Sequence, residues 1–183
     1  MWDWAWKALH NLFGPDVQLD NAPHVDPMSL KPSVWHTSPA GQDFIKKFEG
    51  LRLTAYKPLK GDVWTIGWGY TGPDVHEGLI WSREQADIAF THRLNTEFEP
   101  AVNRVCNGVP TTQGQFDAMV SLAYNIGAQG FSTSQVAKLH RQSLYEACAD
   151  TFERYDHFHG VELDALRNRR EQEGQMYLDA SPK

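Results

Sequence analysis

The spacing of apolar side chains divides the sequence into a short amphipathic helix, an extended connector and a mainly helical remainder. Tryptophan, leucine and phenylalanine recur at helical spacing over residues 2–13, which predicts a helix there. The following stretch carries prolines at positions 15, 23, 27, 32 and 39 with little apolar periodicity, so we expect it to be extended. We therefore predict two parts: residues 1–37, a tryptophan-rich helix with its connector, and residues 38–183, a folded domain.

Capping signals mark the helices of the predicted domain. Ser38 before Pro39 is typical of a helix start, and Gly50 is typical of a helix end. Similar start signals and apolar periodicity predict further helices near residues 83–105, 113–126, 133–140, 143–154 and 162–178.

One segment breaks the helical pattern. Residues 51–57 and 62–70 are rich in β-forming residues and are separated by Lys60-Gly61, which predicts a hairpin. The expected fold class is therefore α+β, mainly helical and arranged in two lobes, with one small antiparallel hairpin or sheet.

The tryptophan-rich face predicted over residues 2–13 needs a partner, and two interpretations are open. The helix docks onto the folded domain or onto a partner chain, or it lies in a membrane interface as an anchor. Lys7 is the only basic side chain among residues 1–9. Because interfacial anchors are usually rich in lysine and arginine, membrane contact is the less favoured interpretation.

Composition is that of an ordinary globular protein and argues against some functions. Hydrophobic residues make up 41% of the chain and charged residues 22%. The formal net charge of −6 argues against a nucleic-acid-binding protein, which normally has a basic face. No apolar run approaches the roughly 20 residues that cross a bilayer, and the N-terminus lacks the pattern of a secretory signal. We therefore expect the chain to begin its life in the cytoplasm.

Cysteine and histidine usage predicts neither a disulfide framework nor a metal site. Cys106 and Cys148 are the only cysteines, and ordinary thiols are the simpler interpretation. The histidines show no spacing with carboxylates that is typical of a metal site.

Glu49 is the first candidate for chemistry. It lies at the C-terminal end of the first predicted domain helix, where the helix dipole and burial under a hairpin would both disfavour an ionised carboxyl. That environment suits a general acid, whereas the plain alternative is an exposed glutamate at a fraying helix end.

Asp62 and Thr65 lie on or before the second predicted strand, so hairpin folding would bring them opposite Glu49. A carboxylic acid facing a carboxylate is the apparatus of glycoside hydrolysis.

Aromatic residues of the same segment offer flat faces for sugar rings. Tyr56, Trp64, Trp68 and Tyr70 are the candidates. For any one of them the alternative is a place in the hairpin core.

These residues resemble those of a known family. "FIKKFEGLRLTAYKPLKGDVWTIGWGYTG" resembles the catalytic hairpin of phage-type lysozymes, the endolysins of glycoside hydrolase family 24. "TTQGQFDAMVSLAYNIGAQGF" and "LDALRNRREQEGQMYL" resemble the central helix and the arginine-rich C-terminal helix of that family. The three motifs occur in the family's order and cover roughly residues 38–179.

The resemblance implies a two-lobe lysozyme fold, no metal or organic cofactor, and cleavage of the β-1,4 bond between N-acetylmuramic acid and N-acetylglucosamine. Glu49 matches the family's acid and Thr65 its threonine. The family aspartate, however, usually follows the tyrosine of the "AY" pair, where this chain has Pro58. Asp62 is therefore expected to act as a displaced substitute, unless the shift turns its side chain to the other face of the strand.

The resemblance adds two residues to the expected cleft. Asn125 ends the central helix, and its alternative role is helix capping. Arg169 or Arg170 is expected to reach Glu49, since the family's C-terminal helix often sends an arginine towards the acid. The alternative is a solvated basic face paired with neighbouring glutamates.

The leading expectation is an endolysin that hydrolyses bacterial peptidoglycan for host lysis. It would act first in the host cytoplasm and then in the periplasm or cell wall, and a holin-type pore made by another protein is implied. Two alternatives stay open: a lytic transglycosylase acting on the same bond, and a noncatalytic wall-binding or virion structural module.

Overall fold

The computed structural model describes residues 34–59, 61–158 and 161–179. The helix predicted over residues 2–13 and most of the predicted connector lie outside these ranges. The elements are, in chain order, α2 (Pro39–Glu49), β1 (Arg52–Tyr56), β2 (Thr65–Gly67), α3 (Arg83–Arg93), the π turn η2 (Leu94–Phe98), α4 (Glu99–Cys106), α5 (Gln113–Ile126), α6 (Ala128–Ser132), α7 (Gln135–Arg141), α8 (Tyr145–Thr151), the 3₁₀ turn η3 (Phe152–Tyr155), β3 (His157–Phe158), β4 (Val161–Glu162) and α9 (Asp164–Asp179). The mainly helical α+β prediction is confirmed.

Local capping chemistry sets the first helix of the domain. The Ser38 hydroxyl accepts a hydrogen bond from the Gly41 amide, and Pro39 occupies the first turn of α2. Gly50 ends the helix with φ +67°, a backbone conformation that favours glycine, and so turns the chain towards β1. The start and end predicted from sequence are both confirmed.

The long helix predicted over residues 83–105 is interrupted by a π turn. The Glu99 amide bonds to the Leu94 carbonyl, and α4 follows with Pro100 in its first turn. Proline has no amide hydrogen, and in a regular α-helix its ring would clash with the carbonyl four residues earlier. The wider π turn relieves that clash, which the apolar periodicity did not reveal.

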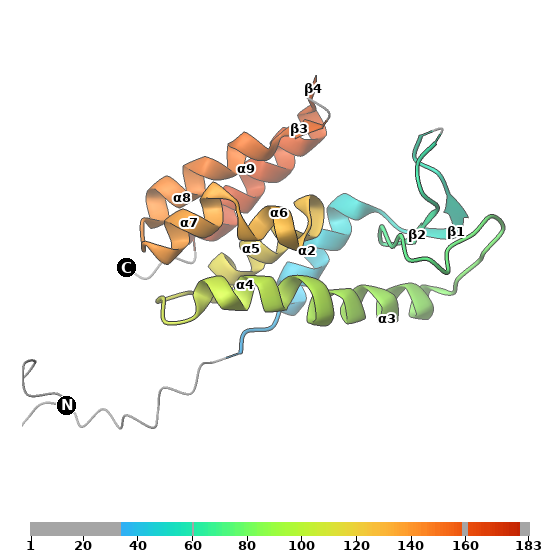
Figure 1. The fold of residues 1–183 in the computed structure, drawn as a ribbon, viewed down its shortest axis with the longest axis horizontal. Helices are drawn as coiled ribbons and strands as arrows, with labels where there is room; N and C mark the ends of the chain where they lie inside the picture. The colour runs from blue at the N-terminus through green and yellow to red at the C-terminus, as the bar shows by residue number, and fades with distance from the viewer. Residues whose placement is uncertain (1–33, 60, 159–160, 180–183) are drawn as a thin grey trace, which may run out of the picture. The chain divides into compact units, whose positions relative to one another are not determined.

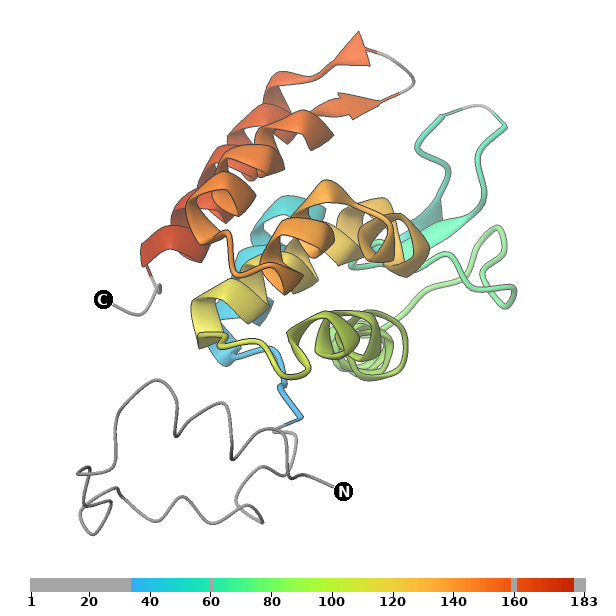
Figure 2. The ribbon, with the colours of Figure 1, turned by 60° about the vertical axis from the view of Figure 1, so that its left-hand side comes forward.

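The hairpin of β1 and β2 is a small antiparallel sheet beside the helices. β1 and β2 pair antiparallel, with Arg52 opposite Gly67 and Tyr56 opposite Thr65. The predicted second strand, residues 62–70, is reduced to Thr65–Gly67. Figures 1 and 2 show the hairpin and the loop after it on one side, apart from the helices α7, α8 and α9. In Figure 1, α3 and α4 form one long run from the hairpin side towards the side of α7 and α8.

The central helix α5 organises the core. Its residues 115–124 are all buried, so the helix is covered on every side. It packs against α2, α4, α6 and α9. None of the helices in the described part of the chain combines the length and the apolar character needed to cross a bilayer.

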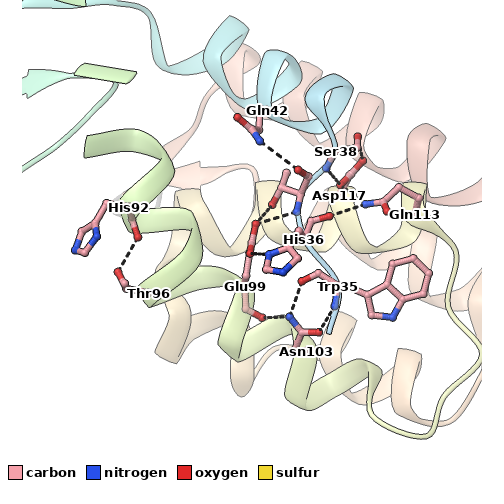
Figure 3. A network of polar contacts seen from close by, with 11 residues as sticks. Trp35, His36, Ser38, Gln42, His92, Thr96, Glu99, Asn103, Gln113 and Asp117 are labelled. Atoms are coloured by element: carbon pink, nitrogen blue, oxygen red, sulfur yellow. Dashed lines mark hydrogen bonds and ion pairs between the residues drawn. The ribbon is translucent and has the colours of Figure 1, made fainter. Parts of the chain in front are cut away.

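The last residues of the predicted connector belong to the packed domain, which begins at Val34. Figure 3 shows this segment bonded to α4 and α5. The Trp35 amide donates to Asn103 Oδ1 at 2.8 Å, and the Thr37 amide donates to Glu99 Oε1 at 2.8 Å. These bonds satisfy polar groups that the start of the domain would otherwise bury unpaired.

A buried polar cluster lies between α7 and α9. His140 is fully buried, with Nδ1 2.6 Å from the Tyr177 hydroxyl and Nε2 3.0 Å from the Thr111 hydroxyl. Cys106 and Cys148 are buried free thiols, and burial raises the pKa of each to about 11. Both cysteines are therefore ordinary structural thiols.

This cluster predicts a loss of stability in acid. Burial, with a smaller effect from the Arg141 charge, lowers the pKa of His140 to about 4. In the unfolded chain the His140 ring takes up a proton near pH 6.5, whereas in the folded chain it stays neutral down to about pH 4. The unfolding free energy of the protein therefore has its full value above pH 6.5 and decreases as the pH falls from 6.5 to 4. The expected loss of unfolding free energy is about 3 kcal/mol.

Urea unfolding measured between pH 4 and pH 7 tests this expectation. His140→Gln should lower stability at pH 7 but flatten the pH dependence, while the exposed His92→Gln should leave the wild-type slope. If the unfolding free energies of wild type and His140→Gln changed equally with pH, His140 would not be the group responsible for the loss of stability in acid.

Candidate active site

Glu49 is the last residue of α2 and stands where the helix meets the hairpin. Its side chain is 18% exposed, and Oε1 accepts a hydrogen bond from Arg169 Nη1 at 2.7 Å. The carboxyl group is thus partly sheltered and held in one place, as a positioned acid requires.

Arg169 is fixed by contacts of its own. It is 4% exposed, and its Nε lies 3.1 Å from Glu173 Oε1 while Nη2 donates to the Ser121 carbonyl at 3.1 Å. The predicted pairing of an arginine of α9 with Glu49 is therefore confirmed for Arg169. Arg170 instead pairs with Glu173, with its Nε 2.8 Å from Oε2.

Glu49 lines two hollows of the described surface. One, of about 760 Å³, follows β1 from the end of α2 and includes Arg52 and Tyr56. The other, of about 490 Å³, reaches the π turn and the C-terminal end of α5, and includes Arg93, Glu97 and Asn125. An elongated ligand lying across Glu49 would occupy both hollows.

A fixed backbone segment forms one wall beside the carboxyl. Gly69 has φ +79°, and a β-carbon there would lie 3.1 Å from Glu49 Oε2, so glycine allows the close approach. The Gly69 carbonyl accepts a hydrogen bond from Arg93 at 3.2 Å, and the preceding Trp68 carbonyl accepts one from the Tyr124 hydroxyl at 2.5 Å.

Trp68 is a core residue, which was the alternative to a sugar-binding role for each aromatic residue of the hairpin. It is only 8% exposed, and its indole nitrogen donates to Asp87 at 2.9 Å. Lys46 also bonds to Asp87, at 2.8 Å, and this bond lowers the pKa of the Asp87 carboxyl. Trp68 thus fastens the hairpin to α3, and we assign it no substrate contact.

The remaining predicted sugar contacts, Tyr56, Tyr70 and Asn125, are partly or fully exposed. Tyr56 lines the larger hollow. Tyr70 packs against Trp81 and donates to Asp74 at 2.8 Å, a bond that raises the pKa of the tyrosine. Asn125 lines the smaller hollow, with its side-chain oxygen 3.2 Å from Arg170 Nη1.

Thr65 and Asp62 lie on the hairpin, and among the described contacts neither bonds to Glu49. Thr65 is buried, faces Tyr56 across the strand pair, and donates to the Val63 carbonyl at 3.3 Å. The Asp62 carboxylate accepts a hydrogen bond from the Leu59 amide at 3.0 Å and so stabilises the hairpin turn. Neither hollow includes Asp62 among its described lining residues.

Sequence reasoning missed the Arg93–Glu97 pair. Glu97 Oε2 lies 3.0 Å from Arg93 Nη2, and both side chains line the smaller hollow. The only signal was a pair of opposite charges four residues apart, which is common on solvated helix faces. Across the described residues, no group of three or more His, Cys, Asp or Glu side chains is placed to hold a metal ion.

Comparisons with known proteins identify the family. The phage lysozyme family matches residues 46–173. The endolysin of Bacillus phage B103 is 35% identical over 147 residues, covering 80% of this chain and 55% of that protein. This chain spans a little over half the length of several such curated relatives.

Two solved structures share the architecture. The endolysin from Escherichia coli O157:H7 phage FAHEc1 is 35% identical, with a TM-score of 0.69 over 81% of this chain and 98% of that chain. The muramidase domain of SpmX from Asticaccaulis excentricus is 33% identical, with a TM-score of 0.66 over 81% of this chain and all of that one. Because the family match includes Glu49, the hairpin, α5 and Arg169, the chain belongs to the phage lysozyme family.

Proposed function

We propose that this chain is a peptidoglycan hydrolase, a muramidase that cleaves the β-1,4 bond between N-acetylmuramic acid and N-acetylglucosamine for host cell lysis. The observation that carries the proposal is Glu49, a sheltered carboxyl group between two hollows and fixed by Arg169. Relatives named endolysin and a neighbour named as a muramidase domain support the same chemistry.

In this mechanism Glu49 donates its proton to the oxygen of the scissile bond as that bond breaks. Water adds to the sugar carbon, and the proton that it loses returns through solvent to the Glu49 carboxylate. The products are a reducing muramic end and a free hydroxyl group. The glycan lies across Glu49, with Tyr56 in one hollow and Asn125 in the other as contacts to the sugars.

Thr65 is the proposed group for the water, and Asp62 is the alternative candidate. The Thr65 hydroxyl makes a long bond of 3.3 Å to the carbonyl of Val63, which precedes β2, so rotation would free it for a water molecule. For Asp62, the bond to the Leu59 amide supports a turn role at least as strongly as a catalytic one.

Asp62→Asn separates these two roles. An asparagine oxygen still accepts the Leu59 bond, so the turn is retained while the negative charge is lost. From the turn contact we expect the rate of wall hydrolysis to fall by less than about tenfold, well below the effect of removing a general acid. A loss of 100-fold or more would instead assign the carboxylate to catalysis.

Access to the wall is a further part of the proposal. We propose action first in the host cytoplasm and then in the periplasm, through a holin-type pore made by another protein. Expression with and without a pore-forming partner tests this route, since lysis that needs no partner would contradict it. Membrane contact by residues 2–13 remains a prediction for residues outside the described part of the chain.

Loss of turbidity from permeabilised Gram-negative cells tests the enzymatic proposal. Wild-type protein should clear the suspension, and the soluble fragments should carry new reducing ends. A protein that binds the cells without releasing fragments would be a noncatalytic wall-binding module.

A further inference from the structure

Arg52 is a cation in the larger hollow beside Glu49. It lies on β1 four residues before Tyr56, and both residues line this hollow. The guanidinium carbon stands 4.8 Å from the centre of the Tyr56 ring. The hollow therefore combines a flat aromatic surface with a positive charge.

Arg52 differs from the other arginines around Glu49 because its charge is not neutralised. Arg169 is paired with Glu49 and Glu173, and Arg93 with Glu97. Within the described residues no carboxylate pairs with Arg52, and its side chain is exposed. Its guanidinium group is free to bind an anionic group of a ligand.

The proposed substrate supplies such a group. Muramic acid carries a lactyl carboxyl, which is free or linked to a peptide that bears carboxylates of its own. A protein with net charge −6 gains no general attraction to an anionic polymer, so local cations must provide it. The planar guanidinium matches a carboxylate through two parallel hydrogen bonds.

We propose that Arg52 is a specificity-determining residue that binds a carboxylate on the muramic acid side of the scissile bond, while Tyr56 supports the sugar ring. This inference rests on the muramidase function proposed above. Arg52 contributes to binding in the ground and transition states alike, so its loss raises KM more than it lowers kcat.

Kinetics on intact sacculi and on sacculi amidated with carbodiimide and ammonia test the inference. For Arg52→Gln we expect a roughly tenfold fall in kcat/KM on intact sacculi, the size of one charge-assisted contact. On amidated sacculi, which lack the carboxylates, wild type and Arg52→Gln should differ by less than about twofold. Arg104→Gln, an exposed change on α4, serves as the matched control and should show neither effect.

A third substrate identifies the carboxylate. Sacculi treated with an amidase lose their stem peptides but keep free lactyl groups. In intact sacculi the peptide-linked lactyl group is an uncharged amide, so a defect that disappears after amidase treatment assigns a peptide carboxylate. A defect that persists shows that Arg52 also binds the lactyl carboxylate that the amidase exposes.

Equal rates for Arg52→Gln and wild type on intact sacculi would overturn the inference, and so would the same fold loss on intact and amidated sacculi. Thermal unfolding of Arg52→Gln and Arg52→Lys shows whether either variant is misfolded, and Arg52→Lys should recover part of the lost KM effect. If the wild-type protein releases no reducing ends, the proposed function fails instead, so the two failures are distinguishable.

Discussion

Glu49→Gln is expected to lower the rate of peptidoglycan hydrolysis by roughly 100-fold or more, because glutamine cannot donate the proton that the leaving sugar needs. The fold should survive the change. The amide oxygen still accepts the hydrogen bond from Arg169 Nη1, and Arg169 keeps its contacts with Glu173 and Ser121. The release of reducing ends and the melting temperature are the two measurements.

Glu84→Gln is the matched control, an exposed glutamate in the first turn of α3 outside both hollows of Glu49. It should retain the wild-type rate. A Glu49→Gln protein as active as this control would remove Glu49 from catalysis.

Glu173→Leu is expected to cause the largest loss of stability. The carboxylate is fully buried and lies 3.1 Å from Arg169 Nε, 2.8 Å from Arg170 Nε and 2.6 Å from the Ser121 hydroxyl. Leucine would leave two buried guanidinium groups without this partner, at a cost of about 3–5 kcal/mol. For a chain of this size the melting temperature should fall by roughly 10 °C.

Glu171→Leu on the same helix is the control, since that side chain is exposed and its loss should change the melting temperature little. Calorimetry of both variants measures the difference. If Glu173→Leu and the control Glu171→Leu had the same melting temperature, the buried ion pairs would contribute no net stability. Because Glu173 also holds Arg169, folded Glu173→Leu protein should hydrolyse peptidoglycan more slowly.

Local chemistry explains which elements could be predicted from sequence. Ser38 and Gly50 set the ends of α2 through contacts within a few residues, so their effect is visible in the sequence. The π turn over Leu94–Phe98 and the short helix α6 lack such a signal. The hairpin was predictable as a unit, but its second strand shortens because only Thr65–Gly67 finds ladder partners.

The site was predictable where a residue lies at a junction of elements. Glu49 follows from its place at a helix end. Neighbouring positions of a helix point about 100° apart. Whether Arg169 or Arg170 pairs with Glu49 therefore depends on how α9 is rotated about its axis, which the sequence does not give. The contacts that separate hairpin core from cleft, such as Trp68 with Asp87, join residues distant in sequence and depend on packing.

Mass spectrometry of the muropeptides released from purified sacculi tests the central claim most directly. Glu49 acting as the acid of a hydrolase predicts reducing muramic ends from wild-type protein and almost none from Glu49→Gln. Release of 1,6-anhydro ends, or equal yields from the two proteins, would contradict the account.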